Sequence, residues 1–393
     1  MKDYLVALMA AVLTLTACHK DKNEEPKQPD TQSVLVYIAG DNNLQDFIID
    51  DVRQMMTASE QLADDCNLIL FVDQKGKRPY FMKVEKGDTI RLETLTQEVK
   101  TSDAETLKMA MTWMTDHYAA KNYGLVLWGH ADGWIVWKKA LSRQRRAYGQ
   151  DTTGGEAWMN IPQMAQALAT LPHLRFIFAD CCCFQSVESA YELRGVTDYI
   201  IASAAEIPGE GAPYQTVIPA LFSQRDDFYQ QAVDAYYNQV SWGYKEPMSV
   251  VKCNEMENLA SATKTALLQS RVHLVTDGYP NVSGLIYYFD QSLFDMQDFM
   301  LRVADSNVYT EWKRTFDQTV VYKTMTEVWM SNHVPYLDAN ETMFRDFQVT
   351  AERYGGVNMF VPQDKTSTFY VQQNSRIKEM AWYEAAGLAD LSW

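Results

Sequence analysis

A histidine and a run of cysteines stand directly after two apolar segments of this chain. His130 directly follows the apolar run 124–129, and the cysteines 181–183 come one residue after the apolar run 175–179. Histidine is the side chain best suited to transfer protons near neutral pH. A cysteine between a strand and a helix lies at the positive end of the helix dipole, which favours the thiolate. A thiolate with a histidine within reach is a nucleophilic dyad.

Each of these motifs also has a purely structural explanation. A histidine after a strand is commonly a turn or core residue, and adjacent cysteines are explained by packing or by a strained vicinal disulfide. Cys18 is the expected site of lipid attachment, as argued below, and five other cysteines remain. If this is an exported protein, disulfide pairing of an odd number of cysteines leaves at least one thiol unpaired. Adjacent cysteine side chains diverge, and no second Cys or His pair has ligand spacing, so we expect no zinc site.

The segments around these motifs alternate between apolar strands and amphipathic helices. Ser102 and Glu105 form a capping box before a helix that ends near Tyr118. Asn160 is the expected cap of a second helix, and a third spans about 186–194. Strands are expected at 33–39, 66–72, 124–129, 175–179, 199–203 and 356–361, with a hairpin at 79–92. This alternation predicts a mainly parallel sheet with helices on both faces, whose strand ends carry the ligand site.

Composition and the first residues restrict the class of protein further. With 47% hydrophobic and 22% charged residues the chain is globular, and 35 Lys and Arg against 51 Asp and Glu give a net charge of −16, which disfavours nucleic acid. Residues 1–17 are typical of a signal peptide that ends in a lipobox before Cys18, the expected lipidation site. Residues 18–32 form a charged, flexible tether. We therefore expect a lipid-anchored protein of the cell envelope, at the outer membrane, facing either periplasm or medium.

Four motifs together resemble the clostripain-like cysteine peptidases, in the clan of caspases, gingipains and legumain. They are Val36–Leu44, Tyr123–His130, Asp180–Cys182 with Ser186–Glu188 and Ala190–Arg194, and Ile207–Tyr214. The resemblance implies an α/β, caspase-like three-layer α/β/α sandwich with a mainly parallel central sheet. Its catalytic core would span 33–215, and a mostly helical part, 216–393, would complete the peptidase unit.

The resemblance also implies roles for individual residues. The family places Ser-Val-Glu four residues after the nucleophile, which makes Cys182 the nucleophile, although the triplet leaves Cys181 open. His130 is then the catalytic histidine. The clan usually has glycine after this histidine, whereas this chain has Ala131, whose N–H still offers an oxyanion donor.

A preference for Arg or Lys before the scissile bond is the specificity that the resemblance implies. Asp180 is the first candidate for the acid of this pocket and Glu210 the second. Their alternatives are a capping carboxylate for the next helix and a solvated loop residue. The basic cluster in 138–146 is either a charged surface loop or a self-cleavage site at the Arg146–Ala147 bond.

These observations predict a lipid-anchored extracytoplasmic cysteine endopeptidase that acts on proteins or peptides with a basic residue before the scissile bond. The alternative is a catalytically inactive relative that binds peptides or proteins at the cell surface. The chemistry requires no cofactor; calcium, which some relatives use, stays open, and the sequence contains no dedicated calcium loop. We expect a monomer that touches the membrane only through its lipid anchor.

Overall fold

The computed structural model describes most of the chain after the tether. The described residues are 29–135, 148–153, 157–238, 245–270, 279–289, 293–327, 329, 347–363, 368–391 and 393. The predicted signal peptide, Cys18 and the Arg146–Ala147 bond lie outside these residues. No helix among the described residues is long and apolar enough to cross a bilayer.

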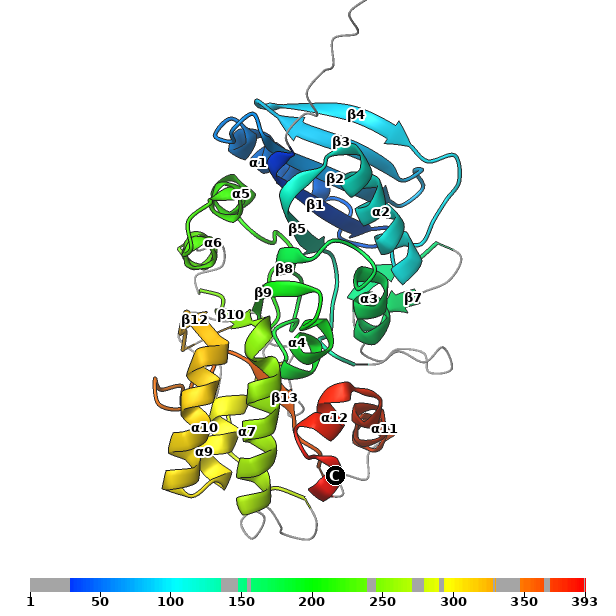
Figure 1. The fold of residues 1–393 in the computed structure, drawn as a ribbon. Coiled ribbons are helices and arrows are strands. Elements are labelled where there is room, and N and C mark those ends of the chain that lie inside the picture. The colour runs from blue at the N-terminus through cyan, green and yellow to red at the C-terminus, as the bar shows by residue number, and fades with distance from the viewer. Residues whose placement is uncertain are drawn as a thin grey trace, which may run out of the picture.

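A nine-stranded sheet forms the centre of the molecule, in the order β12-β10-β9-β8-β5-β1-β2-β3-β4 (Figure 1). The five strands from β9 to β2 are parallel, and antiparallel strands flank them on both sides. Two small sheets pair β6 with β7 and β11 with β13. The strands are β1 Asp30–Gly40, β2 Cys66–Gln74, β3 Tyr80–Glu85, β4 Asp88–Thr94, β5 Ala120–Trp128, β6 Tyr148–Asp151, β7 Ala157–Met159, β8 Leu174–Asp180, β9 Thr197–Ser203, β10 Met248–Lys252, β11 Leu293–Asp295, β12 Val320–Lys323 and β13 Asn358–Phe360.

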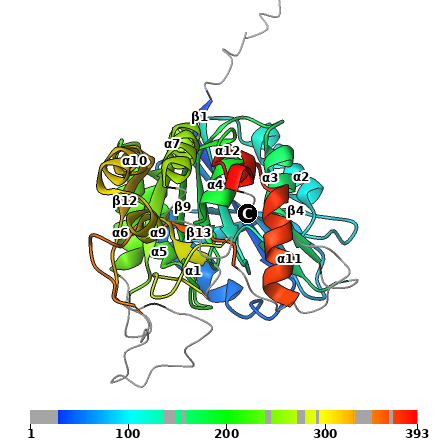
Figure 2. The ribbon, with the colours of Figure 1, turned by 90° about the horizontal axis from the view of Figure 1, so that it is seen from below.

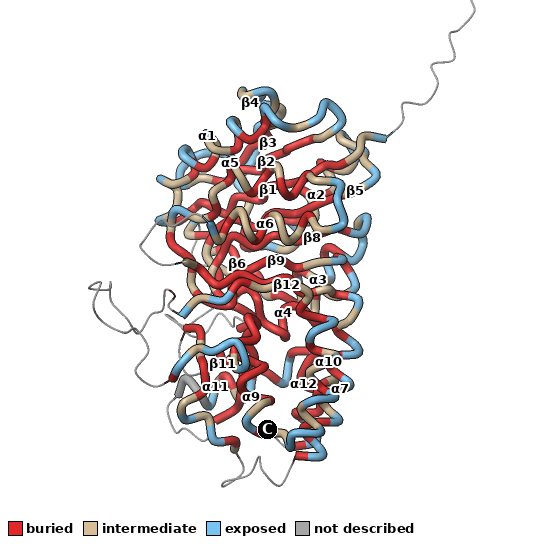
Figure 3. Tube along the Cα trace, turned by 90° about the vertical axis from the view of Figure 1, so that its left-hand side faces the viewer, coloured by how far each residue is buried: buried red, intermediate tan, exposed pale blue. Residues whose placement is uncertain are grey.

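Helices cover both faces of this sheet because the central strands bury side chains on both. In β1, Val34, Val36 and Ile38 face one hydrophobic core, while Leu35 and Tyr37 face the other. One face carries α1 Ile48–Ser59, α5 Tyr214–Phe222 and α6 Phe228–Tyr237. The other carries α2 Ala104–His117, α3 Ile161–Leu168 and α4 Val187–Leu193, which Figure 2 shows on the side opposite α1 and α5. The tube in Figure 3 is buried through the sheet and exposed mainly at loops and outer helix surfaces.

The C-terminal part continues the same core. Its helices are α7 Met256–Gln269, α9 Met296–Val303, α10 Ser306–Thr319, α11 Thr368–Arg376 and α12 Ala381–Ala385. Side chains of α7, α9, α10 and α12 belong to the core cluster that α2, α3 and α4 share with the sheet. This part is mostly helical, as predicted, but it also adds β10 and β12 to the central sheet. The domain boundary at residue 215 stays a prediction.

The three-layer α/β/α prediction is confirmed, and the expected strands and helices are present. One detail of the helix caps is wrong. The cap of α2 is Asp103 and not Ser102: its carboxylate accepts the Glu105 N–H at 3.1 Å. Asp103 is exposed and stands directly before the first residue of α2, where its carboxylate reaches the first N–H groups, whereas Ser102 lies one residue too early to cap the helix.

A second aspartate cap, Asp295, is fully buried and organises the C-terminal part. It accepts the N–H groups of Gln297 and Asp298 at the start of α9. Its other oxygen accepts Tyr288 Oη–H and the N–H groups of Gly355 and Gly356 just before β13. One buried carboxylate therefore satisfies donors from three segments.

We predict that Asp295→Ala lowers the free energy of unfolding by about 3 kcal/mol or more, because it leaves several buried donors without a partner. Asp103→Ala removes an exposed cap and should cost about 1 kcal/mol. Urea unfolding followed by circular dichroism measures both. Equal losses in the two variants would contradict the organising role of Asp295.

Candidate active site

The carboxyl ends of the parallel strands bring the predicted site residues to one edge of the sheet. Trp128 at the end of β5 pairs with Asp180 at the end of β8, and the Gly129 N–H donates to the Asp180 carbonyl at 3.4 Å. His130 and Cys182 each lie two residues beyond this pair. Because neighbouring strands are about 4.8 Å apart, the two side chains start from adjacent positions.

His130 is half-buried and is held by a residue from the loop after β1. Its Nε2 lies 2.7 Å from Asn43 Oδ1. An amide oxygen only accepts hydrogen bonds, so this contact places the ring proton on Nε2 and leaves Nδ1 as the free nitrogen. Burial lowers the pKa of His130. The histidine is therefore a neutral imidazole at pH 7, with Nδ1 able to accept a proton.

The cysteine triplet forms a tight turn after β8. Cys183 has a left-handed backbone with a φ of 56°, and its N–H donates to the Ala205 carbonyl at 2.8 Å. The histidine loop packs on this turn, because a Cβ at Gly133 would lie 3.0 Å from the Cys183 carbonyl oxygen. All three cysteines of the turn are free thiols, which excludes the vicinal disulfide in this structure. Cys181 and Cys183 are buried, and Cys182 is the most accessible of the three.

The Cys182 thiol rests against the loop after β9. Its Sγ accepts the Ile207 N–H at 3.4 Å and lies 3.8 Å from the Ile207 carbonyl oxygen. Burial, followed by the charge of Glu206, raises the pKa of this thiol well above its ordinary value. The expected helix-dipole effect is wrong for this state, because α4 begins only at Val187, where Ser186 caps it. The free protein therefore holds Cys182 as a thiol.

Ala131, the expected oxyanion donor, forms an isolated antiparallel bridge with Tyr148. The hydrogen bond of this bridge runs from the Gly149 N–H to the His130 carbonyl, at 2.8 Å. This hydrogen bond does not involve the Ala131 N–H. Ala131 carries a methyl group where the family usually has glycine, and its N–H, the expected oxyanion donor, directly follows His130 in the same loop.

Asp180 is 4% exposed and accepts two hydrogen bonds through a single oxygen. Oδ2 accepts the Ala212 N–H at 3.0 Å and the Tyr214 hydroxyl at 2.6 Å. Oδ1 is buried and has no hydrogen-bond partner among the described residues. Asp180 therefore does not cap the helix that follows it. Burial raises its pKa to about 6, against the effect of these two hydrogen bonds, so the carboxyl is mainly ionised at pH 7.

A second buried aspartate, Asp51 on α1, belongs to the same acidic group. It accepts the Trp128 Nε1–H at 2.7 Å. Burial and then the charge of Asp180 raise its pKa to about 8, and Glu210 adds to this effect. Glu210 itself is exposed on the loop that brings Ala212 to Asp180. The structure thus brings both predicted specificity residues into one group and adds Asp51.

Sequence reasoning missed three residues of this edge: Asn43, Asp51 and Tyr214. Asn43 and Tyr214 lie inside motifs that the family resemblance singles out, so their positions were marked without a role. Asp51 is one of several acidic residues in an amphipathic helix, and nothing in the sequence distinguishes it from its exposed neighbour Asp50. Only the tertiary contact with Trp128 does.

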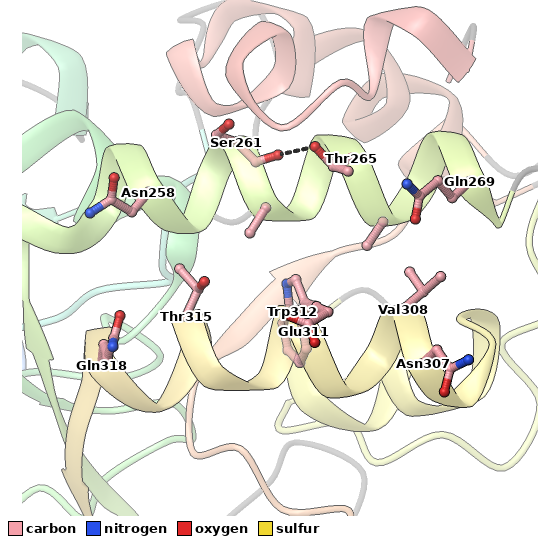
Figure 4. A pocket seen from close by; sticks show the side chains of 12 residues that line it. Asn258, Ser261, Thr265, Gln269, Asn307, Val308, Glu311, Trp312, Thr315 and Gln318 are labelled. Carbon is pink, nitrogen blue, oxygen red and sulfur yellow. Dashed lines mark hydrogen bonds between the residues drawn. The ribbon is translucent and has the colours of Figure 1, made fainter.

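A polar groove in the C-terminal part lies away from this edge. A groove of about 630 Å³ runs between α7 and α10, lined mainly by polar side chains such as Asn258, Thr265 and Gln318 (Figure 4). It contains neither His130 nor Cys182. Among the described residues no group of three or more His, Cys, Asp or Glu side chains is arranged to hold a metal ion.

Comparison with known proteins identifies the family. Residues 36–387 match the Clostripain family, Peptidase C11, so the chain belongs to this family of cysteine peptidases. Clostripain from Hathewaya histolytica is 24% identical over 238 residues, which are 52% of this chain and 43% of clostripain. The match thus spans less than half the length of that curated relative.

Two solved structures are similar over nearly the whole chain. A secreted C11 cysteine protease from Bacteroides thetaiotaomicron, in complex with an irreversible peptide inhibitor, has a TM-score of 0.75 at 29% identity; the match covers 92% of this chain and 99% of that one. An inactive zymogen C11 protease from Parabacteroides distasonis has a TM-score of 0.72 at 25% identity, over 91% and 99% of the two chains. The predicted clostripain-like cysteine peptidase is confirmed as a family assignment.

The buried acid Asp51 leads to a prediction about pH and stability. Its pKa of about 8 in the folded protein exceeds the ordinary value of 3.8, so folded protein binds the proton more tightly than unfolded chain does. The stabilisation that this proton gives is complete below about pH 4 and is lost as the pH rises to about 8. Asp51→Asn keeps an oxygen that accepts the Trp128 N–H. We expect its melting temperature to exceed that of wild type by an amount that grows from pH 5 to pH 8.

The matched control is Asp50→Asn, on the exposed side of the same helix, where Asp50 only pairs with Arg53 at the surface. Thermal melts at pH 5, 6, 7 and 8 measure both variants. A difference in melting temperature between Asp51→Asn and wild type that does not change with pH would contradict the buried, protonated state of Asp51.

Proposed function

We propose that this protein is a lipid-anchored cysteine endopeptidase that cleaves peptide bonds after Arg or Lys with Cys182 and His130. The family assignment supports peptidase chemistry. The basic preference is supported by one observation above all: the buried Asp180 carboxylate, at the end of β8 and two residues before the nucleophile, has an oxygen without a hydrogen-bond partner among the described residues. A cation that enters this site satisfies both its charge and its hydrogen-bonding capacity.

The reaction follows from the arrangement of the two catalytic side chains. Cys182 Sγ attacks the carbonyl carbon of the scissile bond while its proton passes to His130 Nδ1, and the Ala131 N–H binds the oxyanion. The imidazolium then gives the proton to the leaving amine as the carbon–nitrogen bond breaks, which leaves a thioester. Water hydrolyses the thioester and restores the thiol. Asn43 acts as a positioning residue, because it holds the ring through Nε2.

Recognition of the basic side chain and catalysis are linked through the loop after β9. This loop places Ile207 on the Cys182 thiol and Ala212 on the Asp180 carboxylate. Gly211 has a φ of 60°, and a Cβ there would lie 2.6 Å from Asp180 Oδ2. Only glycine therefore lets the loop close on the aspartate. Glu210 adds negative charge on this loop, whereas Asp51, whose pKa burial raises to about 8, is mainly protonated at pH 7.

Location and maturation of the enzyme rest on sequence alone. The lipobox before Cys18 supports attachment to the cell envelope through lipid, and the basic cluster supports self-cleavage at the Arg146–Ala147 bond. Both lie outside the described residues. Protein or peptide substrates complete the proposal, and the protein acts as a monomer.

The nucleophile assignment makes a direct prediction. On a fluorogenic peptide that ends in Arg, Cys182→Ala should lose at least about a thousandfold in kcat, because no other group forms the thioester. Cys181→Ala should keep activity within about fivefold. Mass spectrometry of the same samples should show an intact Cys182→Ala chain and a cleaved wild type. Loss of activity only in Cys181→Ala would move the nucleophile by one residue, and an inactive wild type would favour the peptide-binding relative.

The specificity assignment predicts a second set of kinetic changes. Asp180→Asn should lower kcat/KM for an Arg substrate at least about a hundredfold, since a buried guanidinium loses its counter-charge. The neutral isostere citrulline in place of Arg should be affected far less. In wild type, kcat/KM for Arg should rise through about pH 6, as Asp180 ionises, and Asp180→Asn should lack this rise. An unchanged ratio of Arg to citrulline would contradict the role of Asp180.

A further inference from the structure

A second acidic group lies near the nucleophile, toward β10. Its members are Glu206, in the loop after β9, and Glu246, just before β10; we call them the Glu206–Glu246 pair. In the antiparallel register Met248 pairs with Ser203, so continuing the two strands places Glu246 opposite Ala205. The Ala205 carbonyl accepts the Cys183 N–H at 2.8 Å. Glu246 is therefore about two strand spacings, or ~10 Å, from the nucleophile turn.

Glu246 is a carboxyl group without a partner. Its side chain is 6% exposed, and neither of its oxygens has a hydrogen-bond partner among the described residues. The Tyr236 hydroxyl, from α6, is equally buried and equally unpartnered. Burying such groups without a hydrogen-bond partner is unfavourable, so we interpret them as groups that a ligand satisfies. An acceptor-rich group of this kind fits a cation with several N–H donors.

Electrostatics connects this pair with the nucleophile. Burial and then the charge of Glu206 raise the pKa of Cys182, with a smaller effect of Glu246, and burial followed by the charge of Glu206 raises the pKa of Glu246 well above its ordinary value. The pKa of the Tyr236 hydroxyl is raised by burial and then by the charges of Asp180 and Glu246, so Tyr236 lies near both acidic groups. Asp180 is bound to the start of α5, whereas Glu246 lies beyond β9 on β10. The molecule thus has two groups of acidic side chains near Cys182, one at Asp180 and one at the Glu206–Glu246 pair.

The position of His130 decides which part of a substrate meets the Glu206–Glu246 pair. The leaving amine must take its proton from His130, so the residues after the scissile bond lie on the β5 side of Cys182. The residues before the bond then lie on the opposite side, over β9 and β10. When the side chain directly before the scissile bond (P1) binds at Asp180, the preceding residue of the substrate (P2) is the next one that can reach the Glu206–Glu246 pair.

We propose that the Glu206–Glu246 pair binds the ammonium or guanidinium group of a basic P2 residue, so that this peptidase selects paired basic residues. The proposal rests on the proposed function, with Cys182 as nucleophile and Asp180 at P1. Cation binding at the pair also removes negative charge beside Cys182, which favours the thiolate only when such a substrate is present. The chain carries matching sequences itself: Lys138-Lys139 and Arg145-Arg146, the latter ending at the proposed self-cleavage bond.

The test compares fluorogenic peptides Ala-Ala-X-Arg in which X is Lys or norleucine, a side chain of similar length without charge. Wild type should cleave the Lys peptide with at least about a tenfold higher kcat/KM. Glu246→Gln, which keeps the shape and removes the charge, should reduce this ratio to about twofold or less. Glu255→Gln, on the opposite end of β10, where Glu255 pairs with Lys252, should keep the wild-type ratio. Thermal melts check that both variants fold.

The outcomes separate this proposal from the one on which it rests. If Arg peptides are cleaved but the ratio of Lys to norleucine is the same in wild type and Glu246→Gln, the P2 assignment is wrong and the peptidase assignment stands. If no peptide that ends in Arg is cleaved by wild type, the proposed function itself fails. Asp180→Asn should lower the rates on both peptides together and leave their ratio above fivefold, because Asp180 acts on P1.

Discussion

The hydrogen bonds that Asp180 Oδ2 accepts from Tyr214 and Ala212 hold the catalytic edge together. They attach the loop after β9 to the end of β8, and the same loop places the Ile207 N–H on Cys182. A buried carboxylate normally destabilises a fold unless it is paired. Here one oxygen is satisfied by the fold, and we propose that the other binds the substrate, so that the structural and the recognition roles of Asp180 are divided between its two oxygens.

Negative charge is concentrated at this edge and determines the protonation state of the resting protein. Asp51 is protonated at neutral pH because its own burial and then the charge of Asp180 raise its pKa to about 8, and the Cys182 thiol is kept un-ionised by burial and by nearby carboxylates. We propose that a cationic substrate reverses the local balance, since it brings positive charge to this group of acidic side chains. On this proposal Cys182 becomes nucleophilic as the basic side chain enters. The −16 net charge of the chain agrees with a preference for basic partners.

Much of the fold could be predicted from the sequence because its strands are apolar runs bounded by turns. The runs that became β1, β5 and β8 bury both faces, and parallel strands of this kind place their carboxyl ends at one edge. His130 and the cysteine triplet were therefore predictable as neighbours. The helix caps and the charged groups were harder to predict. Asp103 and not Ser102 caps α2, and the apolar periodicity could not distinguish the two because moving the helix start by one residue changes it little.

The contacts between distant segments could not be predicted, and these contacts determine the chemistry. The helix-dipole argument for a thiolate failed because the chain makes a left-handed turn at Cys183 before α4 begins, and because burial outweighs a dipole at that distance. Asn43, Asp51 and Glu246 look like ordinary polar residues in the sequence. The role of Asn43 arises from its contact with His130, and that of Asp51 from its contact with Trp128. The role of Glu246 arises from nearby Glu206 and from the lack of a hydrogen-bond partner among the described residues.

The central claim is that a cation at Asp180 and a nucleophile at Cys182 form one site. Its most direct test is labelling with two peptide acyloxymethyl ketones that differ only in ending with arginine or with citrulline, followed by peptide mapping of the adduct. The account predicts an adduct on Cys182, formed at least about thirtyfold faster with the arginine probe, and loss of this difference in Asp180→Asn. Equal labelling rates for the two probes, or an adduct on Cys181, would contradict it.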